Sequence, residues 1–245
     1  ECDPGKKFLP TSGHGPRTTA HPRDMGKGVH HDVHGPWAYL GAEAHYRYFN
    51  RDDALWRSEV GVPGYTSLAL LEQNHGGLPA WPADDTNQLW LHHGSWWIGW
   101  DLLTRVFGPW DKEDSGQLRQ QIDCSRFLQA EGLRYVLEAC RRRAFSCSLA
   151  TIWMGHDCYW CTANNSVIEY NTALKPAYSA VQRAYAPLKV SLLYPRLYAL
   201  PGEDFPIEVW ALQDAHHRAH QGALTLRLRS LSGHVLQAWQ EKVSL

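Results

Sequence analysis

The feature that most constrains the fold is a change of residue pattern near Pro187. Upstream of it, short apolar runs alternate with loops and helical patterns, which is typical of an α/β layer with a parallel sheet. Downstream of it, short segments alternate apolar and polar residues, as strands of a β-sandwich do. These segments are 189–193, 205–212, 223–230 and 235–243. We therefore predict two domains, residues 1–187 and residues 188–245.

The first domain contains two well-defined helical patterns. Residues 117–143 carry apolar side chains at helical spacing, and the arginines at the end of this segment complement the helix dipole. Residues 175–185 form the second pattern, with Pro176 near the first helical position, where proline is favoured. Shorter helices are expected over residues 41–50 and from Ser67 onward.

The first domain contains only a few patterns typical of strands. They are residues 7–12, 54–60 and 148–154. Glycine and proline density indicates one long loop from Gly13 to Gly35. A closed (β/α)₈ barrel needs eight strands, and a complete immunoglobulin-like sandwich needs about seven. We therefore predict the C-terminal strands of a TIM barrel followed by a partial immunoglobulin-like β-sandwich, with the other barrel strands expected upstream.

Glu59 is the leading candidate for a catalytic residue. It lies at the C-terminal end of a short apolar strand that is closed by Gly61 and Pro63. Barrel enzymes carry their catalytic residues at this end of a strand. A carboxylate in such a position can attack an anomeric carbon and form a glycosyl-enzyme intermediate. The alternative is a structural role, in which Glu59 forms an ion pair with Arg57 or another cation.

Four segments in the same order resemble glycoside hydrolase family 2, in particular its β-mannosidase-like branch. They are the Trp-Arg-Ser-Glu-Val-Gly stretch 56–61, the stretch 150–160, the stretch 175–187 and the Asp-Val-His-Gly-Pro-Trp stretch 32–37. The first resembles the nucleophile strand of the family, although Val60 stands where an aromatic residue is common. The second resembles the last barrel strand, although His156 replaces an asparagine and Tyr159 replaces a tryptophan.

The resemblance implies a retaining β-glycosidase that is exo-acting, has Glu59 as nucleophile and needs neither a cofactor nor a metal ion. It implies that Trp153 and Trp37 line the subsite of the cleaved sugar. It also implies that His34 and Asp157 are polar neighbours that bind hydroxyl groups or orient the nucleophile. A β-mannoside is the favoured substrate, while β-galactosides, β-glucuronides and β-glucosaminides stay open.

A retaining mechanism also needs a second carboxyl group about 5–5.5 Å from the nucleophile. In the family this general acid/base follows an asparagine, and the chain contains no Asn-Glu pair. Glu43 and Glu72 are the other glutamates near Glu59, and neither ends a predicted strand. We therefore expect the general acid/base to lie upstream, so that this segment alone does not hydrolyse glycosides.

The alternative function is a non-catalytic carbohydrate-binding or inactive glycosidase-like module. The chain holds 12 Trp and 11 Tyr, and their flat rings with polar edges suit sugar binding. Candidate tryptophans for such a module are Trp37, Trp81, Trp90, Trp96, Trp97 and Trp153. An upstream Asn-Glu pair would favour the enzyme. A hydrolase with a serine nucleophile is disfavoured, because no Gly-x-Ser-x-Gly elbow is present.

Metal and redox chemistry are weaker alternatives. Histidines cluster at 30–34, 92–93 and 216–220, but the first cluster lacks a helical pattern and the glutamate of a zinc protease motif. Cys158 and Cys161 have the spacing of a redox motif, but loop residues follow them. With a net charge of −1, nothing indicates a nucleic-acid partner. No apolar run reaches the ~20 residues of a membrane span, so no membrane partner is expected. The compartment is left open.

Overall fold

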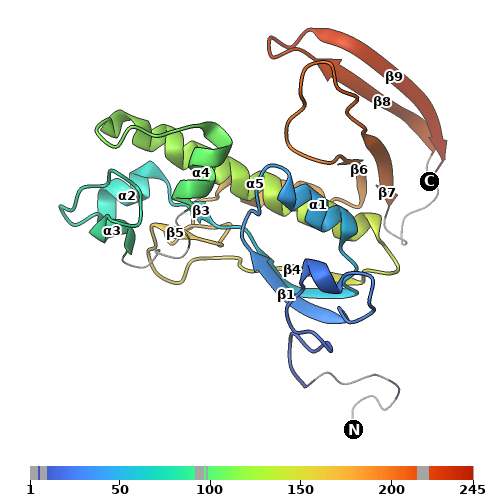
Figure 1. Ribbon diagram of the computed structural model, residues 1–245, viewed down its shortest axis with the longest axis horizontal. Coiled ribbons are helices and arrows are strands. Elements are labelled where there is room, and N and C mark those ends of the chain that lie inside the picture. The colour runs from blue at the N-terminus through green and yellow to red at the C-terminus, as the bar shows by residue number, and fades with distance from the viewer. Residues whose placement is uncertain (1–4, 6–9, 92–96, 98, 214–220, 245) are drawn as a thin grey trace.

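The computed structural model of the chain describes residues 5, 10–91, 97, 99–213 and 221–244. Within these residues the fold is a mixed α/β arrangement of helices and four small sheets, and the β8-β9 pair projects away from the helices (Figure 1). The sheet that matters for the candidate site has the strand order β1-β2-β4, and the other three sheets are two-stranded pairs.

The three-stranded sheet is built from β1 (Asp32–Trp37), β2 (Trp56–Gly61) and β4 (Leu149–Ile152). Both pairings are parallel, as predicted for this part of the chain. The register aligns His34 of β1 with Glu59 of β2. It also aligns Val60 of β2 with Ile152 of β4.

The position of β1 corrects two expectations from the sequence. Residues 10–12 form no strand, and residues 7–9 of the same predicted strand lie outside the described residues. The first strand lies instead at Asp32–Trp37, inside and just after the predicted loop. The sequence did not predict β1 because this strand contains Pro36, and proline lacks the backbone N–H that a central strand needs. β1 lies at an edge of the described sheet, where a proline is tolerated.

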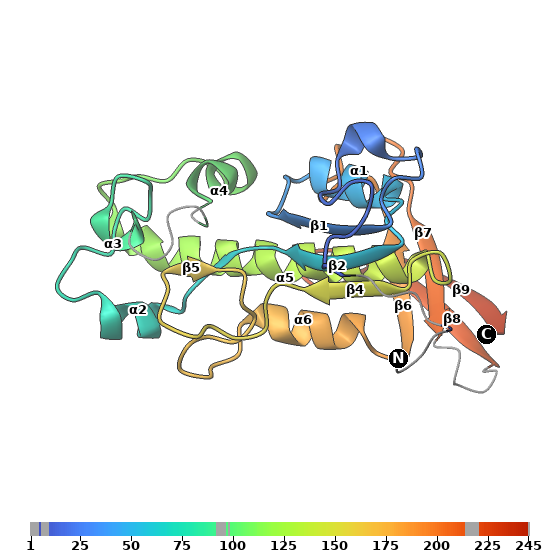
Figure 2. The same cartoon turned by 90° about the horizontal axis from the view of Figure 1, so that it is seen from below.

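The long helix α5 (Leu118–Arg142) lies along this sheet and confirms the helix predicted over 117–143. A short 3₁₀ turn, η3 (Ser115–Gln117), leads into it. The second predicted helix is α6 (Pro176–Ala184), which packs beside α5 (Figure 2). The helix α1 (Ala44–Arg51) confirms the shorter helix predicted nearby and also contacts α5.

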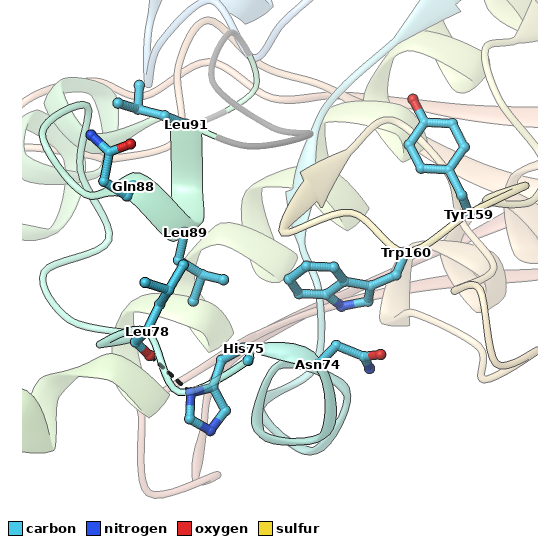
Figure 3. Close-up of a pocket in the computed structure, with 9 residues that line it drawn as sticks. Asn74, His75, Leu78, Gln88, Leu89, Leu91, Tyr159 and Trp160 are labelled. Carbon is cyan, nitrogen blue, oxygen red and sulfur yellow. Dashed lines mark hydrogen bonds between the residues drawn. The ribbon is translucent and has the colours of Figure 1, made fainter.

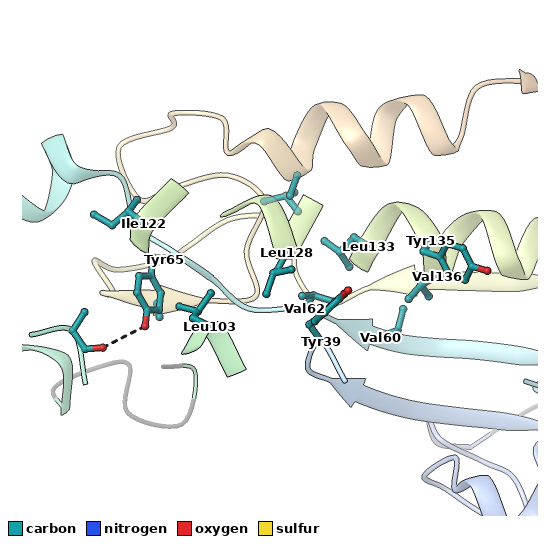
Figure 4. Packing of buried hydrophobic residues seen from close by; sticks show 14 of the residues in the cluster. Tyr39, Val60, Val62, Tyr65, Leu103, Ile122, Leu128, Leu133, Tyr135 and Val136 are labelled. Carbon is teal, nitrogen blue, oxygen red and sulfur yellow. Dashed lines mark hydrogen bonds between the residues drawn. The ribbon is translucent and has the colours of Figure 1, made fainter. Parts of the chain in front are cut away.

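The hydrophobic core fills the space between α5 and the strands. Buried residues of α5 such as Leu128, Leu133 and Val136 lie against Val60 and Val62 (Figure 4). Burying a side chain of this size contributes about 1.5–3 kcal/mol each. The core therefore fixes β2 against the helix and leaves its C-terminal end available for a site.

Several short elements lie beyond the ends of the sheet, on the side away from the C-terminal strands (Figures 1 and 2). They are β3 (Gly64–Tyr65), α2 (Leu68–Asn74), α3 (Gln88–Leu91), α4 (Trp100–Phe107) and β5 (Ala163–Asn164). The Ser67 hydroxyl caps α2 by accepting a hydrogen bond from the Leu70 backbone, as expected for a serine at a helix start. Near the N-terminus lies the 3₁₀ turn η1 (Pro22–Asp24).

The strands predicted after Pro187 are present. They are β6 (Leu188–Leu193), β7 (Glu208–Gln213), β8 (Gln221–Arg229) and β9 (Val235–Ser244). They form two separate antiparallel pairs, β6-β7 and β8-β9. Arg142 at the end of α5 donates a hydrogen bond to Ser191 Oγ of β6 at 2.6 Å. The first pair is therefore joined to α5 by a polar contact.

Candidate active site

Glu59 lies near the C-terminal end of β2, two residues before Gly61, and next to His34 on β1. The His34 Nδ1 atom lies 3.8 Å from Glu59 Oε2, and the two side chains are 22% and 25% exposed. On its other side, His34 Nε2 lies 2.8 Å from Ser12 Oγ. The His34 and Trp37 rings meet edge to face, with their centroids 6.2 Å apart. The parallel pairing of β1 with β2 therefore gathers a carboxylate, an imidazole and an indole at one end of the sheet.

Arg57 does not neutralise Glu59. Its guanidinium group is buried and donates a hydrogen bond to Asp52 Oδ1 at 2.5 Å and another to the Gly35 carbonyl. Arg143 donates to the other Asp52 oxygen at 2.8 Å. Burial alone lowers the pKa of Arg57, but the Asp52 carboxylate outweighs this and raises it. Glu59 therefore forms no ion pair with Arg57, whereas the His34 imidazole lies beside it.

Trp153 follows β4 directly and lies beside the end of β2. Its backbone N–H donates to the Val60 carbonyl at 2.8 Å, and its side chain is 42% exposed. The peptide bond between Trp153 and Met154 is cis. Gly61 is packed so closely that an added Cβ would lie 2.5 Å from the Trp153 carbonyl oxygen. An exposed indole at this strand end offers a flat apolar face beside the Glu59 strand.

Asp157 occupies a different environment from the other predicted site residues. It is buried, and Asn164 Nδ2 donates a hydrogen bond to its Oδ1 atom at 2.7 Å. Its backbone N–H donates to the Ile168 carbonyl at 3.1 Å. These contacts connect the loop after β4 to the segment around β5. The structure therefore places His34 beside both Glu59 and Trp37, and it places Asp157 in a buried loop network.

Lys175 belongs to the same buried network and was not singled out by the sequence analysis. Its ammonium group donates to the Gly64 carbonyl at 3.1 Å and to the Asn164 carbonyl at 3.4 Å. Burial lowers the pKa of Lys175 to about 8, although Asp157 and Glu169 oppose this shift. The only local signal in the sequence was its position before Pro176, which indicates a helix start and not a buried charge.

The two glutamates nearest to Glu59 in sequence lie on other elements. Glu43 forms an ion pair with Arg47 at the start of α1, and Glu72 lies exposed on α2. Neither belongs to a strand of the three-stranded sheet. The second carboxyl group of a retaining pair is therefore not supplied by either of them.

The histidine and cysteine clusters show no metal-binding arrangement in the part of the chain that the structure describes. His30 is buried between Asp53, whose Oδ1 lies 2.6 Å from Nδ1, and the His21 backbone N–H. Cys158 is exposed, whereas Cys161 is buried. The histidines at 92–93 and 216–220 and Trp96 lie outside the described residues. Within the described segments, none of the helices has the length and apolar character that crossing a membrane requires.

The chain resembles solved structures of sugar-cleaving enzymes. The β-D-mannosidase from Dictyoglomus thermophilum matches with a TM-score of 0.62 and 18% identity over 93% of this chain and 27% of that chain. An exo-β-D-glucosaminidase matches with a TM-score of 0.56 and 17% identity over 86% of this chain and 25% of that chain. A second structure of that enzyme, described as the exo-chitosanase of Amycolatopsis orientalis, matches with a TM-score of 0.56 and 16% identity, with the same shares covered.

These matches support a fold like that of glycoside hydrolase family 2. The chain spans only about a quarter of the length of each of these structures. No protein-family model and no curated protein sequence matches the chain. At identities below 20%, the likeness concerns the fold and not the chemistry of the site.

Proposed function

We propose that the chain is the part of a retaining β-glycosidase that carries the catalytic nucleophile, Glu59. In this proposal residues 1–187 supply the last strands and helices of a (β/α)₈ barrel, and residues 188–245 begin an immunoglobulin-like sandwich. The observation that carries the proposal is the juxtaposition of Glu59 with His34 at the C-terminal end of a parallel sheet, where Arg57 is engaged by Asp52 instead. The fold shared with a β-D-mannosidase and an exo-β-D-glucosaminidase supports it.

In the proposed reaction, a carboxylate oxygen of Glu59 attacks the anomeric carbon of a β-linked sugar. The bond to the leaving oxygen breaks, and a carboxylic acid on another barrel strand gives its proton to that oxygen. Water then attacks the anomeric carbon of the glycosyl-enzyme, while the same carboxylate, now a base, accepts the proton of the water. Glu59 leaves as a carboxylate, and two inversions give net retention.

The neighbouring residues have separate roles in this proposal. His34 holds the Glu59 carboxylate from one side, since its Nδ1 atom faces Oε2 and Ser12 fixes its other nitrogen. Trp153 and Trp37 supply aromatic walls for the sugar ring, whose C–H groups pack on such faces. Asp157 acts through the loop after β4, because its side chain is bound to Asn164. We favour a β-mannoside as substrate.

The proposal is tested by replacing Glu59 in the complete gene product that contains this chain. Glu59→Ala should lower kcat for an activated β-mannoside by on the order of 10⁴-fold or more, as removal of a covalent nucleophile does in other enzymes. Added azide should restore turnover and yield the α-configured glycosyl azide, because azide then attacks from the face that the carboxylate occupied. Glu72→Ala, an exposed glutamate on α2, is the matched control and should keep full activity.

The non-catalytic binding module is the second candidate, because neither Glu43 nor Glu72 lies on a strand of the sheet that carries Glu59. It predicts sugar binding without turnover in the complete gene product. An unaltered rate in Glu59→Ala, together with turnover in the parent protein, would contradict Glu59 as the nucleophile. Sugar binding with no turnover of any β-glycoside would favour the binding module.

A further inference from the structure

A large cavity lies beyond the ends of the strands and shares no lining residue with the site at Glu59. Its volume is about 990 Å³, which is at the upper end of the range of about 300–1,000 Å³ for small-molecule sites. Figure 3 shows its walls. The lining residues are Asn74, His75, Gly76, Leu78, Gln88, Leu89, Leu91, Tyr159 and Trp160.

The walls of the cavity combine aliphatic and aromatic surfaces. Leu78 and Leu89 line one side, while Tyr159 and Trp160 line the other (Figure 3). Tyr159 is 51% exposed. None of the nine lining residues is an aspartate, glutamate, lysine or arginine. The cavity therefore suits an uncharged ligand that has flat apolar faces.

Polar side chains also line the cavity. His75 Nδ1 lies 2.8 Å from the Leu78 carbonyl oxygen. Because a carbonyl only accepts, Nδ1 carries the proton and Nε2 of the neutral ring is an acceptor. Asn74 Nδ2 donates to the Leu70 carbonyl at 2.8 Å, which leaves its Oδ1 atom as an acceptor. The exposed Gln88 amide supplies both a donor and an acceptor.

The cavity lies at the same end of the sheet as Glu59. One wall comes from residues 74–91, in the segment that follows β2, and the other comes from the loop that follows β4. Trp160 is seven residues beyond Trp153 in that loop, so their Cα atoms are separated by at most about 25 Å of extended chain. The cavity and the Glu59 strand are thus connected by two short chain segments, one after β2 and one after β4.

We propose that this cavity is a distal subsite for a neutral β-linked oligosaccharide, whose terminal unit is held at Glu59. The inference rests on the proposed glycosidase function and extends it. A sugar ring packs its C–H face on Tyr159 and Trp160, and its hydroxyl groups bond to His75, Asn74 and Gln88. Because the walls carry no acidic side chain, uncharged chains such as mannose oligomers are preferred over cationic glucosamine oligomers.

The test measures binding without turnover, in the complete gene product with Glu59→Gln. Isothermal titration compares mannose, β-1,4-mannotetraose and the tetramer of β-1,4-linked glucosamine. We expect mannotetraose to bind about tenfold more tightly than mannose, and more tightly than the glucosamine tetramer. Adding Tyr159→Ala should remove most of this advantage while affinity for mannose is unchanged. Tyr170→Ala is the matched control, since that tyrosine is also 51% exposed and does not line the cavity.

The outcomes separate this inference from the proposed function. The distal subsite is refuted if mannotetraose binds no more tightly than mannose, or if Tyr159→Ala leaves the affinity for mannotetraose unchanged. In that case the glycosidase proposal stands, provided that mannose binds or that the enzyme with Glu59 intact hydrolyses a β-mannoside. If 4-nitrophenyl β-mannoside gains the same Tyr159-dependent affinity as mannotetraose, the cavity holds an apolar leaving group and the sugar subsite is refuted. If neither sugar binds and no β-glycoside is hydrolysed, both proposals fail.

Discussion

Protonation of His45 should weaken the contact between α1 and α5. The ring is fully buried, and its Nε2 atom lies 3.2 Å from the Gly132 carbonyl oxygen of α5. The Leu40 backbone N–H donates to Nδ1 at 3.4 Å. A carbonyl accepts and an N–H donates, so the ring is neutral and carries its proton on Nε2. A second proton on Nδ1 would face the Leu40 N–H and would bring an unpaired charge into the core.

The size of the effect follows from the pKa of His45. Burial lowers this pKa from 6.5 to about 4, although the hydrogen bond to Gly132 opposes the shift. The unfolded chain therefore binds a proton more readily than the folded chain between these values. Stability from the neutral ring is complete above pH 6.5 and is lost as the pH falls toward 4. At 1.36 kcal/mol per pH unit, the loss is about 3 kcal/mol.

Hydrogen exchange with mass spectrometry measures this loss locally in the complete gene product. After correction for intrinsic exchange rates, the opening constant of the α1 peptide should rise on the order of 100-fold between pH 7 and pH 4, the equivalent of about 3 kcal/mol. His45→Gln keeps a donor but does not titrate, so its opening constant should show a much smaller rise. His31→Gln, at an exposed histidine, should behave as the wild type does. Equal pH dependence in wild type and His45→Gln would refute the reasoning.

Three further variants test other buried features. Asp52→Asn leaves the buried Arg57 without its carboxylate and should cost about 3–5 kcal/mol in thermal unfolding; a loss below 1 kcal/mol would argue against the pair. Gly61→Ala places a Cβ 2.5 Å from the Trp153 carbonyl and should destabilise by about 1–3 kcal/mol while raising KM for a β-mannoside. Since the folded pKa of Lys175 is lowered to about 8, wild-type stability relative to Lys175→Met should rise between pH 8 and 10 in urea titrations.

Elements with a continuous local pattern could be predicted from the sequence. Helix α5 was predicted because its apolar stripe persists at helical spacing over many turns. The strands β2 and β4 were predicted because short apolar runs are closed by turn residues. Glu59 could be placed at a strand end for the same reason.

Features that depend on distant residues could not be predicted in this way. β1 contains Gly35 and Pro36, which are typical of a loop, so that only its pairing with β2 shows that it is a strand. The pairing of Arg57 with Asp52 could not be predicted, because Asp52 lies on the loop after α1 and no periodic pattern connects the two residues. The distal cavity is formed by two segments more than 60 residues apart in sequence, so the set of residues that line it could not be predicted before the fold brought the segments together.

The identity of the nucleophile is the central claim, and covalent labelling tests it most directly. The complete gene product is incubated with 2-deoxy-2-fluoro-β-mannosyl fluoride, which slows hydrolysis of the glycosyl-enzyme, and the labelled peptide is mapped by mass spectrometry. A single label on Glu59, in the peptide that contains β2 (Trp56–Gly61), is the predicted result. A stoichiometric label on another carboxylate, in a protein that hydrolyses the β-mannoside, would contradict the assignment of Glu59.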